Sequence, residues 1–137
     1  MLIDTRYSEK ALALLRIVAS VLFIEHATSK LFNFPPFPGG ALPPTGSLFW
    51  IAGVIELIGG LLLLFGLLSR PVAFLLSGEM AVAYFMIHAP KSTFPMLNGG
   101  EGAILFCFIF LFIAAAGPGE WSVDKARSKR VARKETE

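Results

Sequence analysis

The segment SLFWIAGVIELIGGLLLLFGLL, residues 47–68, carries one ionisable residue, Glu56, in an otherwise apolar run. About 20 such residues let a helix cross the roughly 30 Å hydrocarbon core of a bilayer. Residues 11–32, 71–89 and 100–117 are similar in length and composition. Lipid leaves backbone polar groups unsatisfied in any open strand, and none of the four segments alternates like a strand. The sequence predicts an all-α integral membrane four-helix bundle.

The overall composition favours a membrane protein over a soluble domain. Of the 137 residues, 55% are hydrophobic and 16% are charged, whereas soluble domains carry about 25% charged residues. The length is that of one domain. We assign residues 1–120 to the transmembrane domain and residues 121–137 to a basic cytoplasmic tail. The first segment is interpreted as a retained helix rather than a signal peptide, because Arg16 interrupts it and three more segments follow.

Lysine and arginine residues are distributed unevenly over the flanks and loops. Arg6 and Lys10 precede the first segment and Arg70 lies in the short second loop, whereas Lys91 and the rim residue Lys30 face the other side. Basic residues mark the cytoplasmic side. The sequence therefore predicts a multi-pass protein of the bacterial inner membrane with both termini in the cytoplasm. Six further basic residues of the tail support this orientation: Lys125, Arg127, Lys129, Arg130, Arg133 and Lys134.

Eight ionisable residues lie within or at the rims of the apolar segments. A charge at bilayer depth costs at least about 2.5–3.5 kcal/mol, so such residues are paired, neutralised or functional. Three helices bring polar groups to the outer level of the predicted bundle, and this convergence indicates a binding pocket there. The candidate ligand-binding residues are Arg16, His26, Lys30, Glu56, His88 and Glu101, and Glu25 and Glu79 complete the polar set.

Each candidate also has a structural interpretation. Arg16 shares a helical stripe with Lys30 and would hold the bundle together by pairing with Glu56 or Glu79. A mid-depth glutamate without a cation would stay protonated, because burial disfavours the charged form. Glu56 and Glu79 are therefore candidates either for a proton relay or for a neutral latch between helices. His26 and His88 would equally be satisfied by carbonyl groups at a helix rim.

No motif of soluble-enzyme chemistry is found, and catalytic residues cannot be named. The single cysteine, Cys107, lies in an apolar run and excludes an intrachain disulfide. His26 and His88 lack the paired spacing of metal ligands, so we expect no metal site. No cofactor motif is detectable. The tail has no aromatic residue apart from Trp121, so no nucleic-acid partner is expected.

Several short motifs together resemble the DoxX family of small four-helix membrane proteins. The glutamate followed by a glycine pair in the second segment is fairly specific when combined with the arginine and lysine of the first. Two positions depart from the family pattern: Ala27 stands where a glycine is more common, and Glu25 where an apolar residue is usual. The motifs are Leu15-Arg16, EHATSKLF (25–32), AGVIELIGGL (52–61), GLLSR (66–70), NGGE (98–101), and GPG (117–119) with SVD (122–124).

The resemblance implies a membrane subunit of a redox-associated complex. DoxX-like proteins are associated with thiosulfate:quinone oxidoreduction in some archaea. In some bacteria they form membrane complexes with a superoxide dismutase and a sulfurtransferase, linked to thiol and oxidative stress. The expected ligand is then a quinone or a thiol-derived molecule, and the expected partners are the lipid bilayer, redox proteins and a second copy of the chain. A small proton-coupled transporter or permeability factor, and a non-catalytic membrane scaffold, are the alternatives.

Overall fold

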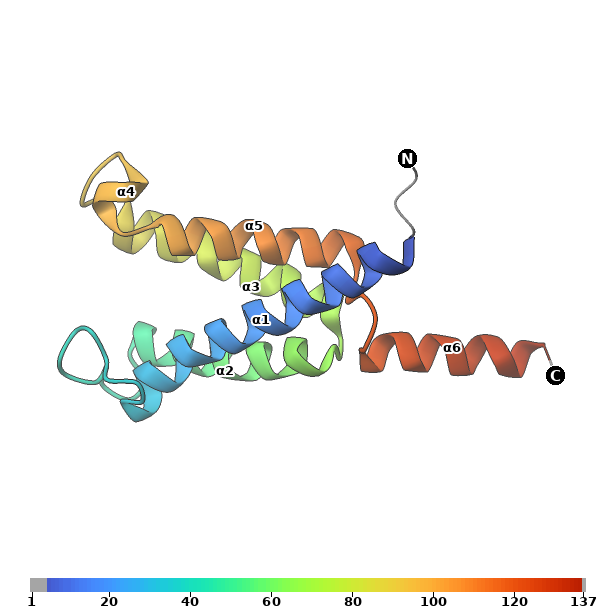
Figure 1. Ribbon diagram of the computed structural model, residues 1–137. Coiled ribbons are helices and arrows are strands. Elements are labelled where there is room, and N and C mark those ends of the chain that lie inside the picture. Colours follow the sequence, from blue (N-terminus) through green and yellow to red (C-terminus); the bar gives the residue numbers. More distant parts are fainter. Residues whose placement is uncertain (1–4, 137) are drawn as a thin grey trace.

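The computed structural model describes residues 5–136, and over these residues it contains helices, turns and loops but no strand. The all-α class is thus confirmed (Figure 1). The elements are α1 (Thr5–Phe32), α2 (Leu48–Phe65), α3 (Ser69–Ala83) continued by the π-helix η1 (Tyr84–His88), the short α4 (Pro95–Asn98), α5 (Glu101–Ala116) and α6 (Val123–Glu135).

The ends of α2 follow from its flanking residues. The Ser47 hydroxyl accepts a hydrogen bond from the Trp50 N–H at 3.3 Å and caps the first turn. Gly66 closes the helix in the left-handed region, with φ +68°, and its N–H bonds the carbonyl groups of Leu62 and Leu63. A glycine is favoured there because a Cβ opposes positive φ. The turn it forms sends the chain directly into α3.

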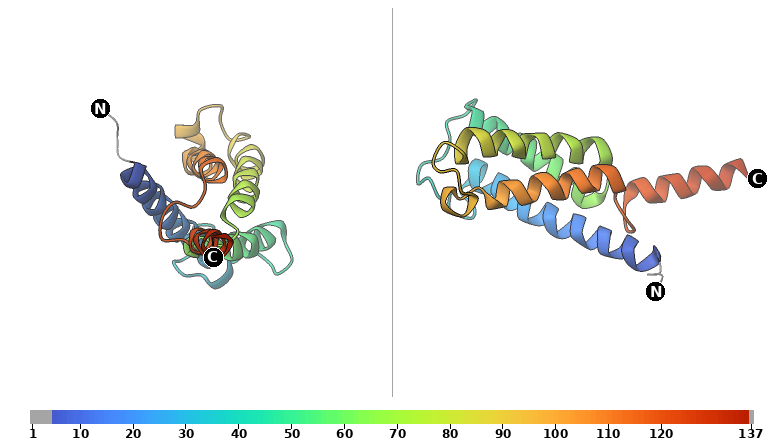
Figure 2. Two further views of the ribbon diagram at one scale, coloured as in Figure 1. Left: turned by 90° about the vertical axis from the view of Figure 1, so that its right-hand side faces the viewer. Right: turned by 90° about the horizontal axis from the view of Figure 1, so that it is seen from above.

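The helices pack as two antiparallel pairs, α1 with α2 and α3 with α5 (Figures 1 and 2). The loops of residues 33–47 and 89–100 lie at one end, which we call the loop end. Residues 5–10, the α2–α3 turn and α6 lie at the opposite end, which we call the terminal end. α6 projects beyond the bundle from the terminal end. The described parts of both termini therefore lie at the same end.

Small residues of α2 let it approach two neighbours at once. A Cβ built on Gly60 would lie 2.7 Å from Ile24 Cγ1 of α1, and one on Gly59 would lie 2.8 Å from Leu76 Cδ2 of α3. Small residues at helix contacts allow such close approach in membranes. The GG pair therefore positions α2 between α1 and α3, which brings polar residues of the three helices close together.

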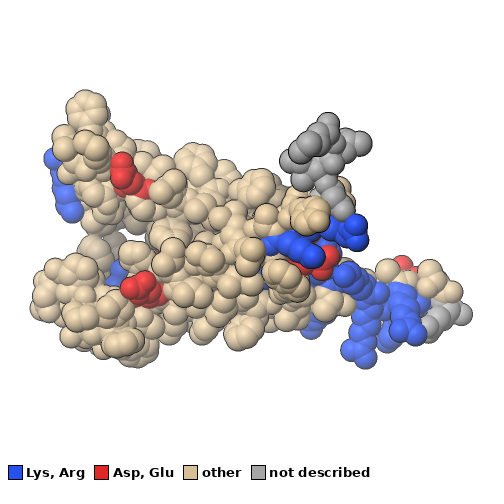
Figure 3. Space-filling view, in the orientation of Figure 1, with Lys and Arg blue, Asp and Glu red and all other residues tan. Residues whose placement is uncertain are grey.

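The outer surface of the two pairs is apolar. Leu22, Ile58, Phe74 and Phe108 are among many large hydrophobic side chains that are about half exposed or more, and Figure 3 shows charged residues gathered mainly at the terminal end. Such a continuous apolar surface is typical of a lipid-facing protein. Among residues 5–136, three helices are long and apolar enough to cross a membrane: Thr5–Phe32, Leu48–Phe65 and Ser69–His88. The apolar α5 is shorter, with 16 residues.

Candidate functional site

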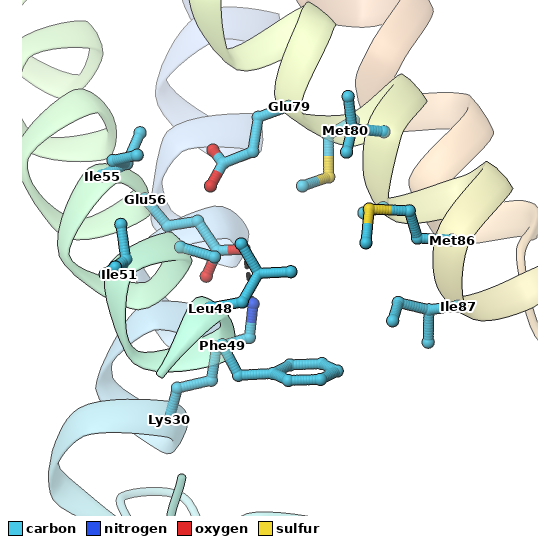
Figure 4. A pocket seen from close by; sticks show the side chains of 13 residues that line it. Lys30, Leu48, Phe49, Ile51, Ile55, Glu56, Glu79, Met80, Met86 and Ile87 are labelled. Atoms are coloured by element: carbon cyan, nitrogen blue, oxygen red, sulfur yellow. Dashed lines mark hydrogen bonds and ion pairs between the residues drawn. The ribbon is translucent and has the colours of Figure 1, made fainter. Parts of the chain in front are cut away.

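An ion pair between α1 and α2 lies at the centre of the site. Lys30 Nζ is 2.5 Å from Glu56 Oε1, and the two side chains are 18% and 2% exposed. Figure 4 shows Lys30 rising from α1 toward the Glu56 carboxylate. A lysine near a helix end can extend its apolar stem along neighbouring side chains and place its charge at a different depth. Lys30 thereby neutralises the mid-helix carboxylate of α2.

Glu79 of α3 lies beside this pair on the side away from Lys30 (Figure 4). Its carboxyl group and that of Glu56 both border the same pocket. Both oxygens of Glu79 and Oε2 of Glu56 are buried, and no residue of the described chain donates a hydrogen bond to them. Two carboxyl groups therefore share one lysine in an apolar environment, a charge balance that favours a bound proton or a donor from a ligand.

The pocket between α2 and α3 has a volume of about 210 Å³. Apart from Lys30, Glu56 and Glu79, its lining is apolar: Leu48, Phe49, Ile51, Ala52, Ile55, Met80, Val82, Ala83, Met86 and Ile87. Several rim residues are exposed on the lipid-facing surface, among them Ile51 at 45% and Val82 at 56%. The rim of the pocket is therefore part of the apolar outer surface.

A second pocket, of about 260 Å³, is lined by residues of α1, α2, α3, η1 and α5. Its polar lining residues are His26, Lys30, Glu56 and His88. The two pockets share Lys30, Phe49, Glu56, Met80, Ala83 and Ile87. The Lys30–Glu56 pair thus borders both pockets, of which the first also contains Glu79 and the second both histidines.

The π-helix η1 positions His88 in this second compartment. His88 Nδ1 lies 3.0 Å from the Asn98 carbonyl oxygen, and its ring stacks on Tyr84 at 6.4 Å between centroids. Asn98 in turn bonds the Ser92 carbonyl oxygen through Nδ2 at 2.9 Å and accepts from the Gly100 N–H at 2.7 Å. The NGGE motif therefore forms a turn that holds the histidine in place.

The structure brings together four of the six candidate ligand-binding residues, namely His26, Lys30, Glu56 and His88, with Glu79 beside them. Glu101 lies in the first turn of α5 and is exposed, outside both pockets. Glu25 is also exposed, on α1. The sequence did not indicate Met80 and Phe49 as lining residues, because single apolar residues carry no signal in an apolar segment.

Arg16 lies far from these pockets and has a different set of partners from the expected glutamates. It is fully buried. Its guanidinium donates to the carbonyl oxygens of Leu63 at 2.5 Å and Leu64 at 2.6 Å, at the end of α2. It also donates to Pro118 at 2.8 Å and Trp121 at 3.0 Å, in the segment after α5. The pairing of Arg16 with Glu56 or Glu79 is therefore wrong; Arg16 joins α1, α2 and the α5–α6 connection.

Further polar contacts join the helices at the terminal end. Asp124 of α6 accepts hydrogen bonds from the backbone N–H groups of Leu68 at 3.0 Å and Ser69 at 2.8 Å, and so caps α3. Burial opposes its charge, but these hydrogen bonds outweigh that effect and lower the pKa of Asp124. Lys125 bonds Glu9 and Glu120, which raises the pKa of Lys125. The terminal end is thus a structural junction.

The geometry of the pockets limits the chemistry of the site. Within residues 5–136, no group of three His, Cys, Asp or Glu side chains is arranged to hold a metal ion. What the pockets offer is an ammonium group, two carboxyl groups and two imidazoles around apolar space. Such a set can bind a molecule of mixed polarity and exchange protons with it.

The comparison with known sequences identifies a family region in the chain. The DoxX family profile matches residues 11–89, which is more than half of the chain and contains α1 from Ala11 onward, α2, α3 and η1. The chain belongs to the DoxX family. The match includes Lys30, Glu56 and Glu79, so the ion pair and the α2–α3 pocket of this DoxX protein lie within the family region.

Relatives of this DoxX protein cover most of its length. An uncharacterized protein of Haemophilus influenzae is 42% identical over 91% of this chain and 96% of its own. Inner membrane protein YqjF of Escherichia coli is 27% identical over 84% of this chain and 90% of its own. Uncharacterized membrane protein Rv3486 of Mycobacterium tuberculosis is 26% identical over 85% of this chain and 80% of its own. No solved structure matches the chain. With its apolar helices, this DoxX protein is a multi-pass protein of the bacterial inner membrane.

Proposed function

We propose that the protein is a membrane subunit of a redox-associated complex and binds the headgroup of a lipid-soluble quinone in the α2–α3 pocket. The observation that carries this proposal is the Lys30–Glu56 ion pair at the inner wall of an apolar pocket with a lipid-facing rim. A quinone enters from the bilayer with its apolar chain outward and its ring toward the pair.

The donor groups around the pockets suit a quinone. The Lys30 ammonium has three N–H donors and directs one to Glu56, so donors remain for a quinone carbonyl. His26 and His88 border the adjoining pocket and supply further donors. Most of the remaining lining is aliphatic, aromatic or thioether, which suits a methylated aromatic ring.

We also propose that α5 is the fourth membrane-spanning helix and that both termini lie in the cytoplasm. A bundle with three membrane crossings would place the two termini on opposite sides of the membrane. In this protein, α6 and the start of α1 lie at the same end of the bundle. The 16 residues of α5 extend about 24 Å, so flanking residues must complete the crossing. Arg70 and the basic residues of α6 lie at the terminal end, which supports its cytoplasmic orientation.

Partner proteins complete the proposed complex. The sequence contains no cofactor motif that would deliver electrons to a quinone, so a redox partner supplies or removes them. The DoxX membership suggests a thiol- or sulfur-linked partner with a role in oxidative stress. A second copy of the chain is a further candidate for the complex, with Glu25 at the contact.

The test measures quinone binding to the full-length protein in mild detergent. The Trp121→Phe variant leaves Trp50, next to the lining residue Phe49, as the single tryptophan reporter. We expect saturable quenching by a short-chain ubiquinone, a Kd at least tenfold higher in Lys30→Met, and partial recovery in Lys30→Arg. Lys91→Met changes an exposed loop lysine and serves as the matched control.

Two results would overturn the proposal. One is the absence of saturable quenching together with the absence of quinone from the protein purified out of its own membranes, as measured by mass spectrometry. The other is unchanged quinone reduction in membranes from a deletion strain.

A further inference from the structure

The α2–α3 pocket contains a polar strip made of Lys30, Glu56 and Glu79. The two ends of this strip differ in hydrogen-bonding character. Lys30 supplies N–H donors at one end, and Glu79 lies at the other, with Glu56 between them (Figure 4). The three oxygens Glu56 Oε2, Glu79 Oε1 and Glu79 Oε2 are buried, and nothing in the described part of the chain donates to them. The Glu79 end of the pocket therefore consists of acceptors.

The surrounding side chains do not supply the missing donors. Apart from Lys30, Glu56 and Glu79, the lining residues of the pocket have apolar side chains, and none of these side chains carries an N–H or O–H. A buried acceptor without a donor is costly. A ligand that brings a donor to Glu79 therefore gains free energy that a ligand without one does not gain.

The two redox forms of a quinone differ in this respect. The oxidised form has two carbonyl acceptors, of which one is satisfied at Lys30 and the other faces the carboxyl oxygens. The reduced form has two hydroxyl groups: one oxygen accepts from Lys30, and the opposite O–H donates to Glu79. The reduced form is thus complementary to both ends of the strip.

We propose that the α2–α3 pocket selects the reduced, hydroxyl-bearing form of its ligand, a quinol, and that Glu79 is the residue that binds the quinol hydroxyl. This inference rests on the proposed function and adds to it the redox form that is bound. Glu79 accepts a hydrogen bond from the ligand directly and does not act through another residue.

The preference for the hydroxyl-bearing ligand persists when the carboxyl groups of Glu56 and Glu79 share one proton. A protonated Glu79 contributes one O–H donor, but its second oxygen and Glu56 Oε2 remain acceptors. A hydroxyl group donates and accepts, so it satisfies both kinds of partner, whereas a carbonyl group satisfies only the donor. The hydroxyl-bearing ligand is preferred in either protonation state.

Preference for the reduced form changes the redox properties of the bound ligand. If the quinol binds tenfold more tightly than the quinone, the midpoint potential of the bound two-electron couple rises by about 30 mV. The bound couple would then accept electrons more readily than the same couple in the lipid.

Three probes of one ring size test the proposal: trimethylhydroquinone, trimethylbenzoquinone and the dimethyl ether of the hydroquinone. Their binding to the full-length Trp121→Phe protein is measured by Trp50 quenching under argon. We expect the hydroquinone to bind at least tenfold more tightly than the quinone. The dimethyl ether lacks the O–H donors and should bind more weakly than the hydroquinone by a similar factor.

Variants assign the preference to Glu79. Glu79→Leu should reduce the ratio of quinone Kd to hydroquinone Kd to about one, and the isosteric Glu79→Gln should lower it in part. Glu101→Gln alters an exposed glutamate outside both pockets and should leave the ratio unchanged. The probe series on the Trp121→Phe protein needs no change at Glu79, so a poorly folded Glu79 variant leaves the test intact.

The outcomes separate this inference from the proposed function. Equal or tighter binding of the quinone, or an unchanged ratio in a folded Glu79→Leu protein, overturns the selection of the quinol by Glu79. Failure of all three probes to bind overturns quinone-class binding itself.

Discussion

Lys30 Nζ lies 2.5 Å from Glu56 Oε1 and joins α1 to α2 in the interior of the bundle. The lysine is close to the end of its helix, whereas the glutamate is near the middle of its own. The pair therefore places a charged lysine inside the apolar region and compensates a carboxylate that would otherwise be isolated there. It also forms the shared wall of the two pockets.

Breaking the Lys30–Glu56 pair on one side should destabilise the protein strongly. Lys30→Met leaves a buried carboxylate without its cation, and we expect a loss of about 3–5 kcal/mol in the free energy of unfolding. The double variant Lys30→Met/Glu56→Met should recover most of this loss, because no charge remains buried. Unfolding by SDS in mixed micelles measures both. A double variant as unstable as the sum of the single variants would contradict the pairing.

Arg16 should not tolerate replacement by lysine. Its guanidinium serves four backbone carbonyl groups in two segments, and the point-like ammonium of lysine cannot reproduce that fork. We expect Arg16→Lys to cost at least about 2 kcal/mol, since buried carbonyl groups lose their donors. Thermal unfolding in detergent tests this. Arg127→Lys, on the exposed surface of α6, is the control and should have little effect.

Asp124 should make stability depend on pH under acidic conditions. Its pKa in the folded protein is lowered, so its contribution is present at neutral pH. That contribution decreases as the pH falls below 3.8, the ordinary pKa of an aspartic acid, toward the lower folded pKa. Asp124→Asn should lower stability at pH 7 by about 0.5–2 kcal/mol, as expected for a lost helix cap.

The melting temperature between pH 3 and pH 7 measures the Asp124 contribution. The difference between the wild-type protein and Asp124→Asn should be largest at neutral pH and should narrow as the pH falls below 3.8. A constant difference across the range would show that the carboxylate charge is not what stabilises the turn.

Two glycines of the membrane region should respond oppositely to alanine. A Cβ on Gly60 would lie 2.7 Å from Ile24 Cγ1, whereas a Cβ on Gly78 of α3 would meet nothing within 4 Å. Gly60→Ala should cost about 1–3 kcal/mol, because α1 and α2 must separate or Ile24 must leave its rotamer. Gly78→Ala should stabilise by about 0.5–1 kcal/mol through its helix propensity. SDS unfolding compares the two, and equal effects would contradict the α1–α2 packing.

Most helix boundaries could be read from local signals. Ser47 and Gly66 flank α2 because capping depends on neighbouring residues, and Pro35 and Pro36 follow the end of α1. The π-helix at Tyr84–His88 had no such signal. Its two end residues, Tyr84 and His88, both contact Asn98, which lies beyond the end of the helix.

The candidate site was predicted in part. The helical period correctly placed Arg16 and Lys30 on one stripe, but 14 residues separate them, which is about 21 Å along a helix. They therefore serve opposite ends of the bundle. The pairing of Lys30 with Glu56 depends on how α1 crosses α2, and no periodicity within one helix contains that angle.

The sequence by itself determined the apolar helices, the membrane location and the set of polar residues that such helices must bury, because hydropathy and helical period are local properties. The tertiary structure alone decided which of these residues meet. Gly59 and Gly60 bring α2 against two neighbours, and that contact places Lys30, Glu56 and Glu79 around one pocket. Pairing is a property of helix crossing and side-chain reach, and both arise only when the helices pack.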